Sequence, residues 1–373
     1  MYWTIHLEGG PRRVNHAAVG LGGKIYSFGG YCSGENYEIK RPLDVFVLDT
    51  CNYHWKELCK PTEDMDQYEL APYQRYGHTV VVYKNKAYLW GGRNDSDGQS
   101  AILHQFDPVT HEWHIISPVD GMTPPARVGH SACVIGDFMI IFGGYEEQFR
   151  RFSPNTYTFN FNTRKWAELQ THGCPPAPRE FNTATVISNR MYVFGGSYGP
   201  LYNHGEAYFD ILKYLDMETW SWHEAAVSGD IPEGRRSHSA WSYQGKLYIF
   251  GGYVGNNINK FLNTMHQYDP ETCNWREIQA GGECPDARRR QCTVLMDDKL
   301  FLFGGIKPTK QPTYLSGKNN FIELSDLYVL DYAPFVKSLK YRCLLTLKNS
   351  VLYDVVQHST ILPRGLRLDL TSL

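Results

Sequence analysis

Short apolar segments that end in two consecutive glycines recur six times along the 373-residue chain. An aromatic residue comes directly before each glycine pair, and no apolar period of helical length fills the intervals, so the pattern favours short strands over helices. The pairs begin at residues 29, 91, 143, 195, 251 and 304, which gives intervals of 62, 52, 52, 56 and 53 residues. Glycine weakens a strand interior, so a periodic pair indicates a bend or a close backbone approach in each unit. A period of this length predicts a repeat protein.

A second apolar strand and then a tryptophan follow most of the glycine pairs. The sixth unit has the second strand at residues 326–330 but no tryptophan after it, whereas the N-terminal segment Tyr2–His6 carries Trp3. Pairing these two segments would complete the sixth unit and remove an exposed sheet edge. We therefore predict an all-β fold, a six-bladed β-propeller over residues 1–332 that is closed by its N-terminal strand. The tryptophans of the first five units are Trp55, Trp113, Trp166, Trp220 or Trp222, and Trp275.

Arginine precedes the innermost strand of every predicted blade. In a four-stranded antiparallel blade, this loop and the loop after the glycine pair open on one face, next to the axis. Six such loops bring positive charge around one opening, although the formal net charge of the chain is only −2. The fifth and sixth units have two and three arginines in a row, so the charge is densest there. These arginines are Arg13, Arg75, Arg127, Arg179, Arg235–Arg236 and Arg288–Arg290.

Positive charge at a concave, partly desolvated opening predicts a site for a carboxylate or a phosphate, because the guanidinium fork matches planar anions. A structural alternative stays open for Arg13, Arg75 and Arg127, since such arginines can tie neighbouring blades together. This alternative suits consecutive arginines less well, because they cannot all point into blade interfaces. The candidate carboxylate-binding residues are Arg75, Arg127, Arg179, Arg235, Arg236, Ser237, Arg289 and Arg290.

Histidines and tyrosines also recur in phase with the repeat. The histidines follow the arginine loops, and their periodicity favours a structural role over catalysis or metal binding. The tyrosines follow the glycine pairs and could form the wall of a peptide groove, since variable loops on a rigid scaffold usually carry recognition. The histidines are His16, His78, His130 and His238, and the tyrosines are Tyr31, Tyr145, Tyr198, Tyr253 and Tyr314.

Composition narrows the classes of partner. A charged fraction of 20% and a formal net charge of −2 argue against attraction of the whole surface to nucleic acid or to an anionic membrane. The nine cysteines are scattered without C-x-x-C spacing, and Met1–Gly10 contains no apolar run. No stretch approaches the roughly 18–20 apolar residues of a membrane helix. We expect a soluble protein of the cytoplasm or nucleus that needs no cofactor and no metal and does not bind nucleic acid directly.

The repeat stops after Asp331, and residues 333–373 have apolar positions at helical spacing. An amphipathic helical segment that caps the edge of the propeller is one interpretation. The residue types suggest another, because Leu339 and Cys343 match the L-x-x-x-C core of the elongin-binding BC box. The later run Leu362-Pro363, with Leu366, is similar to the cullin-2 box. We interpret residues 333–373 as a C-terminal helical segment with BC-box-like and cullin-2-box-like motifs.

The glycine pair after an apolar strand, with a tryptophan at near-constant offset, resembles kelch repeats. Together with the tail motifs and the segments Leu7–His16 and Gly234–Ser239, the chain resembles the kelch domain-containing substrate receptors of cullin-2 RING ubiquitin ligases. The resemblance implies a non-catalytic adaptor that binds elongin B/C and cullin-2. It also implies capture of C-terminal degrons, often ending in glycine, whose chain-end carboxylate lies in an arginine-lined pocket, so that the target proteins are ubiquitinated and degraded.

Two other classes of function stay open. Sialidases are six-bladed propellers with an arginine cluster, but their S-x-D-x-G-x-x-W repeat is absent, and no phased departure suggests the copper ligands of kelch-containing oxidases. A chromatin-associated or scaffolding kelch protein without a ligase role would use the tail only as a cap. Elongin binding distinguishes that protein from an adaptor.

Overall fold

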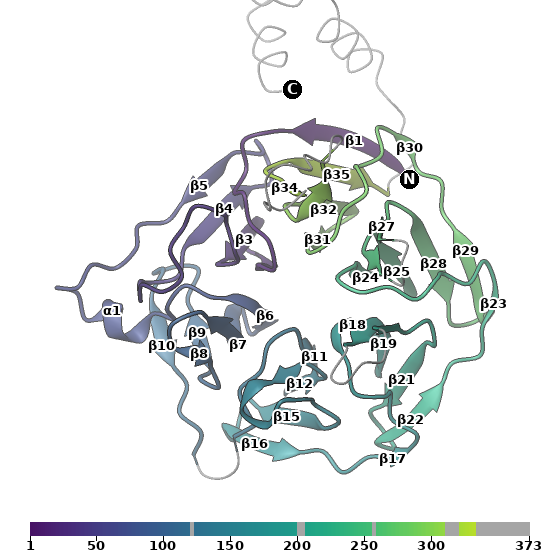
Figure 1. The fold of residues 1–373 in the computed structure, drawn as a ribbon, viewed down its shortest axis with the longest axis horizontal. Coiled ribbons are helices and arrows are strands. Elements are labelled where there is room, and N and C mark those ends of the chain that lie inside the picture. The colour runs from purple at the N-terminus through teal and green to yellow at the C-terminus, as the bar shows by residue number, and fades with distance from the viewer. Residues whose placement is uncertain (120–122, 200–205, 256–258, 310–320, 333–373) are drawn as a thin grey trace, which may run out of the picture.

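Six four-stranded antiparallel sheets surround a central axis in the computed structural model (Figure 1). The structure describes residues 1–119, 123–199, 206–255, 259–309 and 321–332. Within each sheet, the chain runs from the strand nearest the axis outward, and the sheets stand around the axis as blades. The predicted six-bladed β-propeller is confirmed. None of the helices in the described part of the chain is long and apolar enough to cross a membrane.

The blades follow one another in chain order. Blades 1 to 3 consist of β2 (Ala17–Leu21), β3 (Lys24–Phe28), β4 (Val45–Asp49) and β5 (Trp55–Glu57); β6 (Tyr76–Tyr83), β7 (Lys86–Asn94), β9 (His104–Phe106) and β10 (Trp113–Ile115); and β11 (Ser131–Ile135), β12 (Phe138–Phe142), β15 (Thr156–Asn160) and β16 (Lys165–Glu168). Blades 4 to 6 consist of β18 (Glu180–Ile187), β19 (Arg190–Tyr198), β21 (Lys213–Asp216) and β22 (Ser221–Glu224); β24 (Ser239–Tyr243), β25 (Lys246–Phe250), β28 (Met265–Asp269) and β29 (Asn274–Glu277); and β31 (Cys292–Met296), β32 (Lys299–Phe303), β35 (Leu327–Asp331) and β1 (Tyr2–Leu7).

Shorter strands, one short helix and a 3₁₀ turn lie outside the four main strands of each blade. They are β8 (Gly98–Gln99), β13 (Tyr145–Glu146), β14 (Arg151–Phe152), β17 (His172–Gly173), β20 (Ala207–Tyr208), β23 (Ser228–Gly229), β26 (Tyr253–Val254), β27 (Lys260–Phe261), β30 (Gly281–Gly282), β33 (Ile306–Pro308), β34 (Phe321–Glu323), α1 (Gln67–Leu70) and the 3₁₀ turn η1 (Glu147–Phe149).

The N-terminal strand β1 closes the ring as the outer strand of blade 6. It pairs antiparallel with β35, and Trp3 lies opposite Leu330. Trp3 is 4% exposed, so it fills the place that tryptophans fill in the other outer strands. In blade 4 that place belongs to Trp222, which is buried in β22, whereas Trp220 lies in the turn before the strand.

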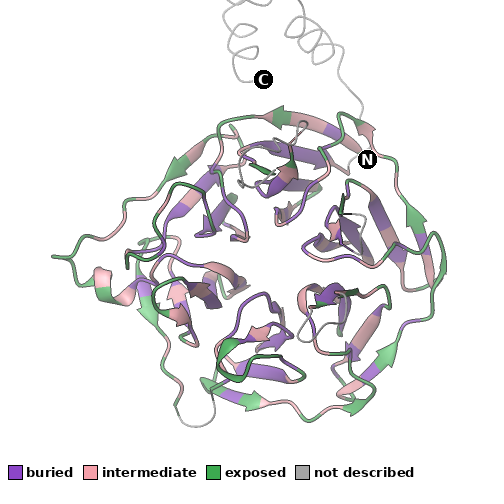
Figure 2. Cartoon of the chain, viewed as in Figure 1, coloured by how far each residue is buried: buried purple, intermediate pink, exposed green. Residues whose placement is uncertain are grey.

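Neighbouring blades are joined by one aromatic contact that repeats six times. The outer-strand tryptophan of each blade packs against the ring that precedes the glycine pair of the previous blade, with ring centroids 5.0–5.9 Å apart. Burial of such rings supplies much of the hydrophobic free energy between blades, about 1.5–3 kcal/mol for each large side chain. Figure 2 shows the buried residues along the strands of the blades and the exposed ones along the outer rim. The pairs are Trp113–Phe28, Trp166–Trp90, Trp222–Phe142, Trp275–Phe194, Trp3–Phe250 and Trp55–Phe303.

A closed circle of backbone hydrogen bonds surrounds the axis, and we call its six residues the axial ring. Each member donates its N–H to the carbonyl oxygen of the member in the preceding blade, over 2.7–3.3 Å. All six have a left-handed backbone, with φ between 53° and 70°. The chain therefore turns sharply in every blade at the same register. The members of the axial ring are Asn15, Gly77, Gly129, Phe181, Ser237 and Arg290.

The glycine pairs form a second circle of backbone hydrogen bonds. The second glycine of each pair donates its N–H to a carbonyl in the next blade, as Gly30 does to Arg75 over 2.9 Å and Gly305 to Arg13 over 2.9 Å. Gly30 has a φ of 96°, and a Cβ built there would lie 2.6 Å from the Cβ of His16. Close approach and a left-handed backbone together explain why the glycine pair marks every blade.

The periodic histidines lie between blades, directly after the axial ring. Burial lowers the pKa of His16, His78 and His238 to about 3, so the rings are neutral. His78 Nε2 lies 3.1 Å from the carbonyl oxygen of Phe28 in the previous blade. Gln291 occupies the same register in blade 6 and donates to the carbonyl of Phe250 over 3.2 Å. In blades 2 to 6 the position therefore carries a polar side chain that bridges blades, and Gln291 shows that it does not need a titrating one.

The buried histidines should make the fold sensitive to acid. A group whose pKa is lowered on folding supports stability fully above its unfolded pKa of about 6.5, and this support disappears as the pH falls towards 3, with a slope of about 1.4 kcal/mol per pH unit and histidine. His238→Gln should reduce that slope, because glutamine already serves in blade 6. The measurement is the free energy of unfolding in urea between pH 7.5 and pH 4.5. His114→Gln, at an exposed position of β10, is the control, and equal slopes for the two variants would contradict the prediction.

Candidate anion-binding site

The first arginine of each loop in blades 2 to 6 is buried inside its own blade, not on the opening. These arginines are 0–3% exposed. Each donates from Nη1 to the carbonyl oxygen of the first glycine of the same blade, over 3.0–3.4 Å, and from Nε to the carbonyl two residues before it, over 2.8–3.1 Å. They therefore hold the loop against the blade. The arginines are Arg75, Arg127, Arg179, Arg235 and Arg288.

This position differs from the expectation that Arg75, Arg127, Arg179 and Arg235 contribute to a carboxylate site. Their N–H groups are directed at backbone carbonyls within the blade, so they are not presented to a ligand at the opening. Arg235 is therefore structural like the arginines of the early blades, although all of them fasten a loop to its own blade and do not tie neighbouring blades together. One signal in the sequence could have shown this, because each of these arginines stands 16 residues before the glycine that it contacts.

Two of the buried arginines form ion pairs with carboxylates. Arg288 forms two parallel bonds to Asp326, each of 2.7 Å, and Arg127 lies 2.7 Å from Glu146. Arg179 instead stacks 3.8 Å from the centroid of Phe209. Burial without an ion-pair partner among the described residues lowers the pKa of Arg179 to about 10.

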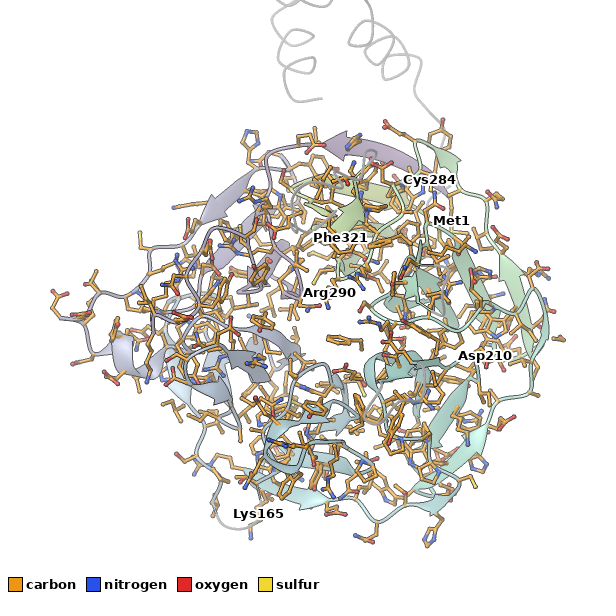
Figure 3. All side chains as sticks on the ribbon, viewed as in Figure 1. Met1, Lys165, Asp210, Cys284, Arg290 and Phe321 are labelled. Carbon is orange, nitrogen blue, oxygen red and sulfur yellow. The ribbon has the colours of Figure 1, made fainter. Side chains whose placement is uncertain are left out.

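The remaining candidates, Arg236, Ser237, Arg289 and Arg290, lie together where blades 5 and 6 meet the axis. Arg290 and Ser237 belong to the axial ring, and Arg236 and Arg289 directly precede them. Figure 3 shows Arg290 at the edge of the central opening. The structure thus brings the fifth and sixth loops together, as the density of arginine predicted, but through the second and third residues of each loop rather than the first.

The arginine cluster has buried donors without a partner. Arg289 is 8% exposed, and the Nε atoms of Arg289 and Arg290 and the Oγ of Ser237 are buried without a hydrogen-bond partner. Burial and the neighbouring guanidinium groups lower the pKa of Arg289 and of Arg290 to about 10. Unpaired buried donors of positive charge are costly, so the site is suited to an anion that accepts several hydrogen bonds.

Two carboxyl groups lie near the cluster without neutralising it. Glu206 forms an ion pair of 2.9 Å with Arg236. Burial raises the pKa of Glu180 to about 7, although Arg236 and Arg290 act in the opposite direction. No carboxylate of the described residues forms an ion pair with Arg289 or Arg290. The cluster therefore keeps a net positive charge.

A cavity of about 820 Å³ opens above Arg289 and Arg290, between blades 6 and 1. A narrower space of about 120 Å³ continues along the axis, bordered by the axial ring and the interblade histidines. Charged and apolar side chains both line the wide cavity. Its further lining residues are Arg12, Val14, Tyr31, Ser33, Ile306, Phe321, Ile322 and Glu323.

Of the tyrosines expected in a groove, Tyr31 lines this cavity, Tyr253 contacts the arginines, and Tyr314 lies outside the described residues. The sequence pattern did not indicate a role for Phe181 in the site. It occupies the axial ring, where blades 1 to 3 have asparagine or glycine. A departure from that pattern at Phe181, Ser237 and Arg290 was the available signal.

Among the described residues, His6, Glu8 and Asp326 bring possible metal-ligand atoms within 4.8 Å of one another. Both oxygens of Asp326 accept hydrogen bonds from Arg288. The group is therefore explained by the ion pair, and we assign it no metal.

Comparison with known proteins agrees with the propeller fold. A model of the KLHDC2/KLHL20/DRC7 Kelch-repeats domain matches residues 77–305, and the Kelch motif matches residues 12–58. Kelch domain-containing protein 3 of Homo sapiens is 41% identical over 376 residues, covering 100% of this chain and 95% of its own length, and its Rattus norvegicus counterpart is equally similar. This chain belongs to the kelch-repeat family of Kelch domain-containing protein 3. Among kelch propellers it is also 26% identical to Kelch domain-containing protein 2 of Bos taurus over 302 residues, covering 70% of this chain and 72% of the relative. The first of these matched regions includes blades 2 to 5 and the arginine cluster of this kelch propeller.

Two neighbouring arginines should behave in opposite ways when they are removed. Arg288→Ala breaks a buried ion pair and leaves the carboxylate of Asp326 without its partner. We therefore expect a loss of about 3–5 kcal/mol in the free energy of unfolding. Arg290→Ala removes a cation from a cluster of like charges, so the loss should stay below about 1 kcal/mol, and stability should even rise at low salt. Guanidinium chloride unfolding of both variants makes the comparison. Equal destabilisation would show that Arg290 is also structural.

Proposed function

We propose that this kelch propeller is the substrate-recognition subunit of a cullin-2/elongin B/C RING ubiquitin ligase and binds C-terminal degrons that end in glycine. The protein would present targets for ubiquitination and proteasomal degradation, and it would catalyse no reaction itself. The observation that carries the proposal is the pair Arg289 and Arg290, which present buried, unpartnered donors beside Ser237 at the open end of the axis. Membership of the family of Kelch domain-containing protein 3 supports the same reading.

A chain-end carboxylate suits this site. It is a planar anion that accepts bidentate hydrogen bonds from guanidinium groups. The space along the axis that Arg290 borders has a volume of about 120 Å³, which is room for the terminal residue of a peptide. The cavity of about 820 Å³ above it can hold the preceding residues of an extended peptide.

Ligase docking rests on the tail motifs. The proposed elongin-binding residues Leu339 and Cys343 and the proposed cullin-binding residues Leu362, Pro363 and Leu366 lie outside the described residues. In sequence, these motifs follow a propeller that β1 closes, and blade 6 does not need any residue after Tyr332 to complete its sheet. This supports separate roles for the propeller and the tail.

Amidation of the chain end should abolish binding of a glycine-ended peptide. Loss of the carboxylate leaves desolvated guanidinium groups unpaired, which costs roughly 2–5 kcal/mol, or about 30- to 5,000-fold in Kd. Fluorescence anisotropy with the free-acid and the amidated peptide measures the difference. Arg289→Ala should weaken the free acid similarly, whereas Arg190→Ala, an equal change of charge at the end of blade 4 opposite its glycine pair, should not. Equal affinity for acid and amide would refute the carboxylate site.

The ligase role predicts that elongin B/C is recovered with the full-length chain from cells. The paired change Leu339→Ala and Cys343→Ala should remove that recovery and leave peptide binding intact, because neither residue belongs to the arginine cluster. Immunoprecipitation followed by mass spectrometry is the measurement. Recovery that the double variant does not change would contradict the role of the tail, and failure to recover elongin B/C with the unaltered chain would favour a scaffolding kelch protein.

A further inference from the structure

Three guanidinium groups share the site although each disfavours the charge of the others. Burial and the neighbouring Arg236 both lower the pKa of Arg289 and of Arg290. Only Arg236 has a carboxylate partner among the described residues, namely Glu206. Some other interaction must hold Arg289 and Arg290 in place when no ligand is bound.

Aromatic rings contact all three guanidinium groups. The ring of Phe181 lies with its centroid 5.6 Å from the guanidinium carbon of Arg290 and 5.9 Å from that of Arg236. The ring of Tyr253 lies 5.3 Å from Arg236 and 4.4 Å from Arg289. The order is therefore Arg290, Phe181, Arg236, Tyr253, Arg289, and we call this alternation the arginine–aromatic ladder.

Phe181 holds its place at a conformational cost. Its φ is 54°, in the left-handed region that bulky residues rarely adopt. The same position of the axial ring is asparagine or glycine in blades 1 to 3, so the hydrogen-bonded circle does not itself need an aromatic residue. A strained residue that the scaffold does not need indicates a use for its side chain.

A ring and a carboxylate compensate an arginine in different ways. The carboxylate of Asp326 occupies two N–H donors of Arg288, and this arginine is structural. The face of a ring stabilises the cation through its quadrupole but accepts no strong hydrogen bond, so the donors stay free for a ligand. The unpartnered Nε atoms of Arg289 and Arg290 are consistent with this difference.

We propose that Phe181 and Tyr253 are positioning residues that space the three arginines into a pre-organised receptor for a planar anion. The identity of the anion as a peptide chain end rests on the proposed function, whereas the ladder itself does not. Pre-organisation raises affinity because the arginines need not be ordered when the ligand binds.

Substitutions that differ only in the ring test the role of Phe181. Phe181→Leu keeps an apolar, strained residue and removes the ring, so the free-acid glycine-ended peptide should bind about 5- to 30-fold more weakly. Phe181→Tyr keeps the ring and should stay within about twofold of the original. Tyr253→Leu and Tyr253→Phe should show the same contrast. Phe209→Leu is the matched control, because it removes a ring from the buried Arg179 and should leave peptide affinity unchanged.

Two results would overturn the proposal. One is an unchanged affinity of the Phe181→Leu variant, and the other is a Phe181→Tyr variant as weak as Phe181→Leu, which would point to packing alone. The difference in peptide affinity between the Phe181→Leu and Phe181→Tyr variants should also increase at low ionic strength. Salt screens the repulsion among the arginines that the rings offset.

A second measurement needs no ligand and separates this proposal from the proposed function. In a double-mutant cycle of unfolding free energies, Phe181→Leu and Arg290→Ala should be coupled, because the ring offsets repulsion only while Arg290 is present. Additive effects would refute the ladder even if peptides bind. If coupling is found but neither the acid nor the amide binds, the proposed function fails and the ladder stands.

Discussion

The axial ring is the constraint on which the rest of the structure depends. Its six backbone hydrogen bonds require a left-handed residue at one register of every blade, and this turn gives the residues around it fixed directions. The arginine two positions before the ring enters the blade, the next residue lies on the open face, and the residue after the ring bridges to the neighbouring blade. Arg288, Arg289, Arg290 and Gln291 are consecutive, yet each meets a different environment for this reason.

The same register allows one residue type to serve two purposes. Arginine in the first position is bonded to carbonyl groups in blades 2 to 6 and is paired with a carboxylate in blades 1, 3 and 6. Arginine in the second and third positions faces aromatic rings, and Arg289 and Arg290 keep their Nε donors available. The fold therefore separates structural charge from binding charge over a distance of one or two residues, with no insertion and no change of blade geometry.

Periodic features were predictable from the sequence, and departures from the period were predictable only in part. The blades, the closure by β1 and the burial of Trp3 follow from spacing, because strand order and aromatic packing repeat with the chain. The role of Arg235 did not follow, since the direction of three adjacent side chains is decided by the backbone angle at Ser237. The role of Phe181 could not be predicted either, because its ring contacts arginines of blades 5 and 6 that are far away in sequence.

The pairing of β1 with β35 also determines when the ring can close. Hydrogen bonding across this pair joins residues that are 325 positions apart, such as Thr4 and Val329. At about 5–20 residues per second, translation keeps the first strand without its partner for tens of seconds while the intervening blades emerge. Blade 6 and the axial ring can be completed only after that interval, because Asn15 of blade 1 donates its N–H to the carbonyl oxygen of Arg290 in blade 6. The anion site, assembled from loops of blades 4 to 6, is therefore among the last parts of the molecule to form, and a partly synthesised propeller presents no finished receptor.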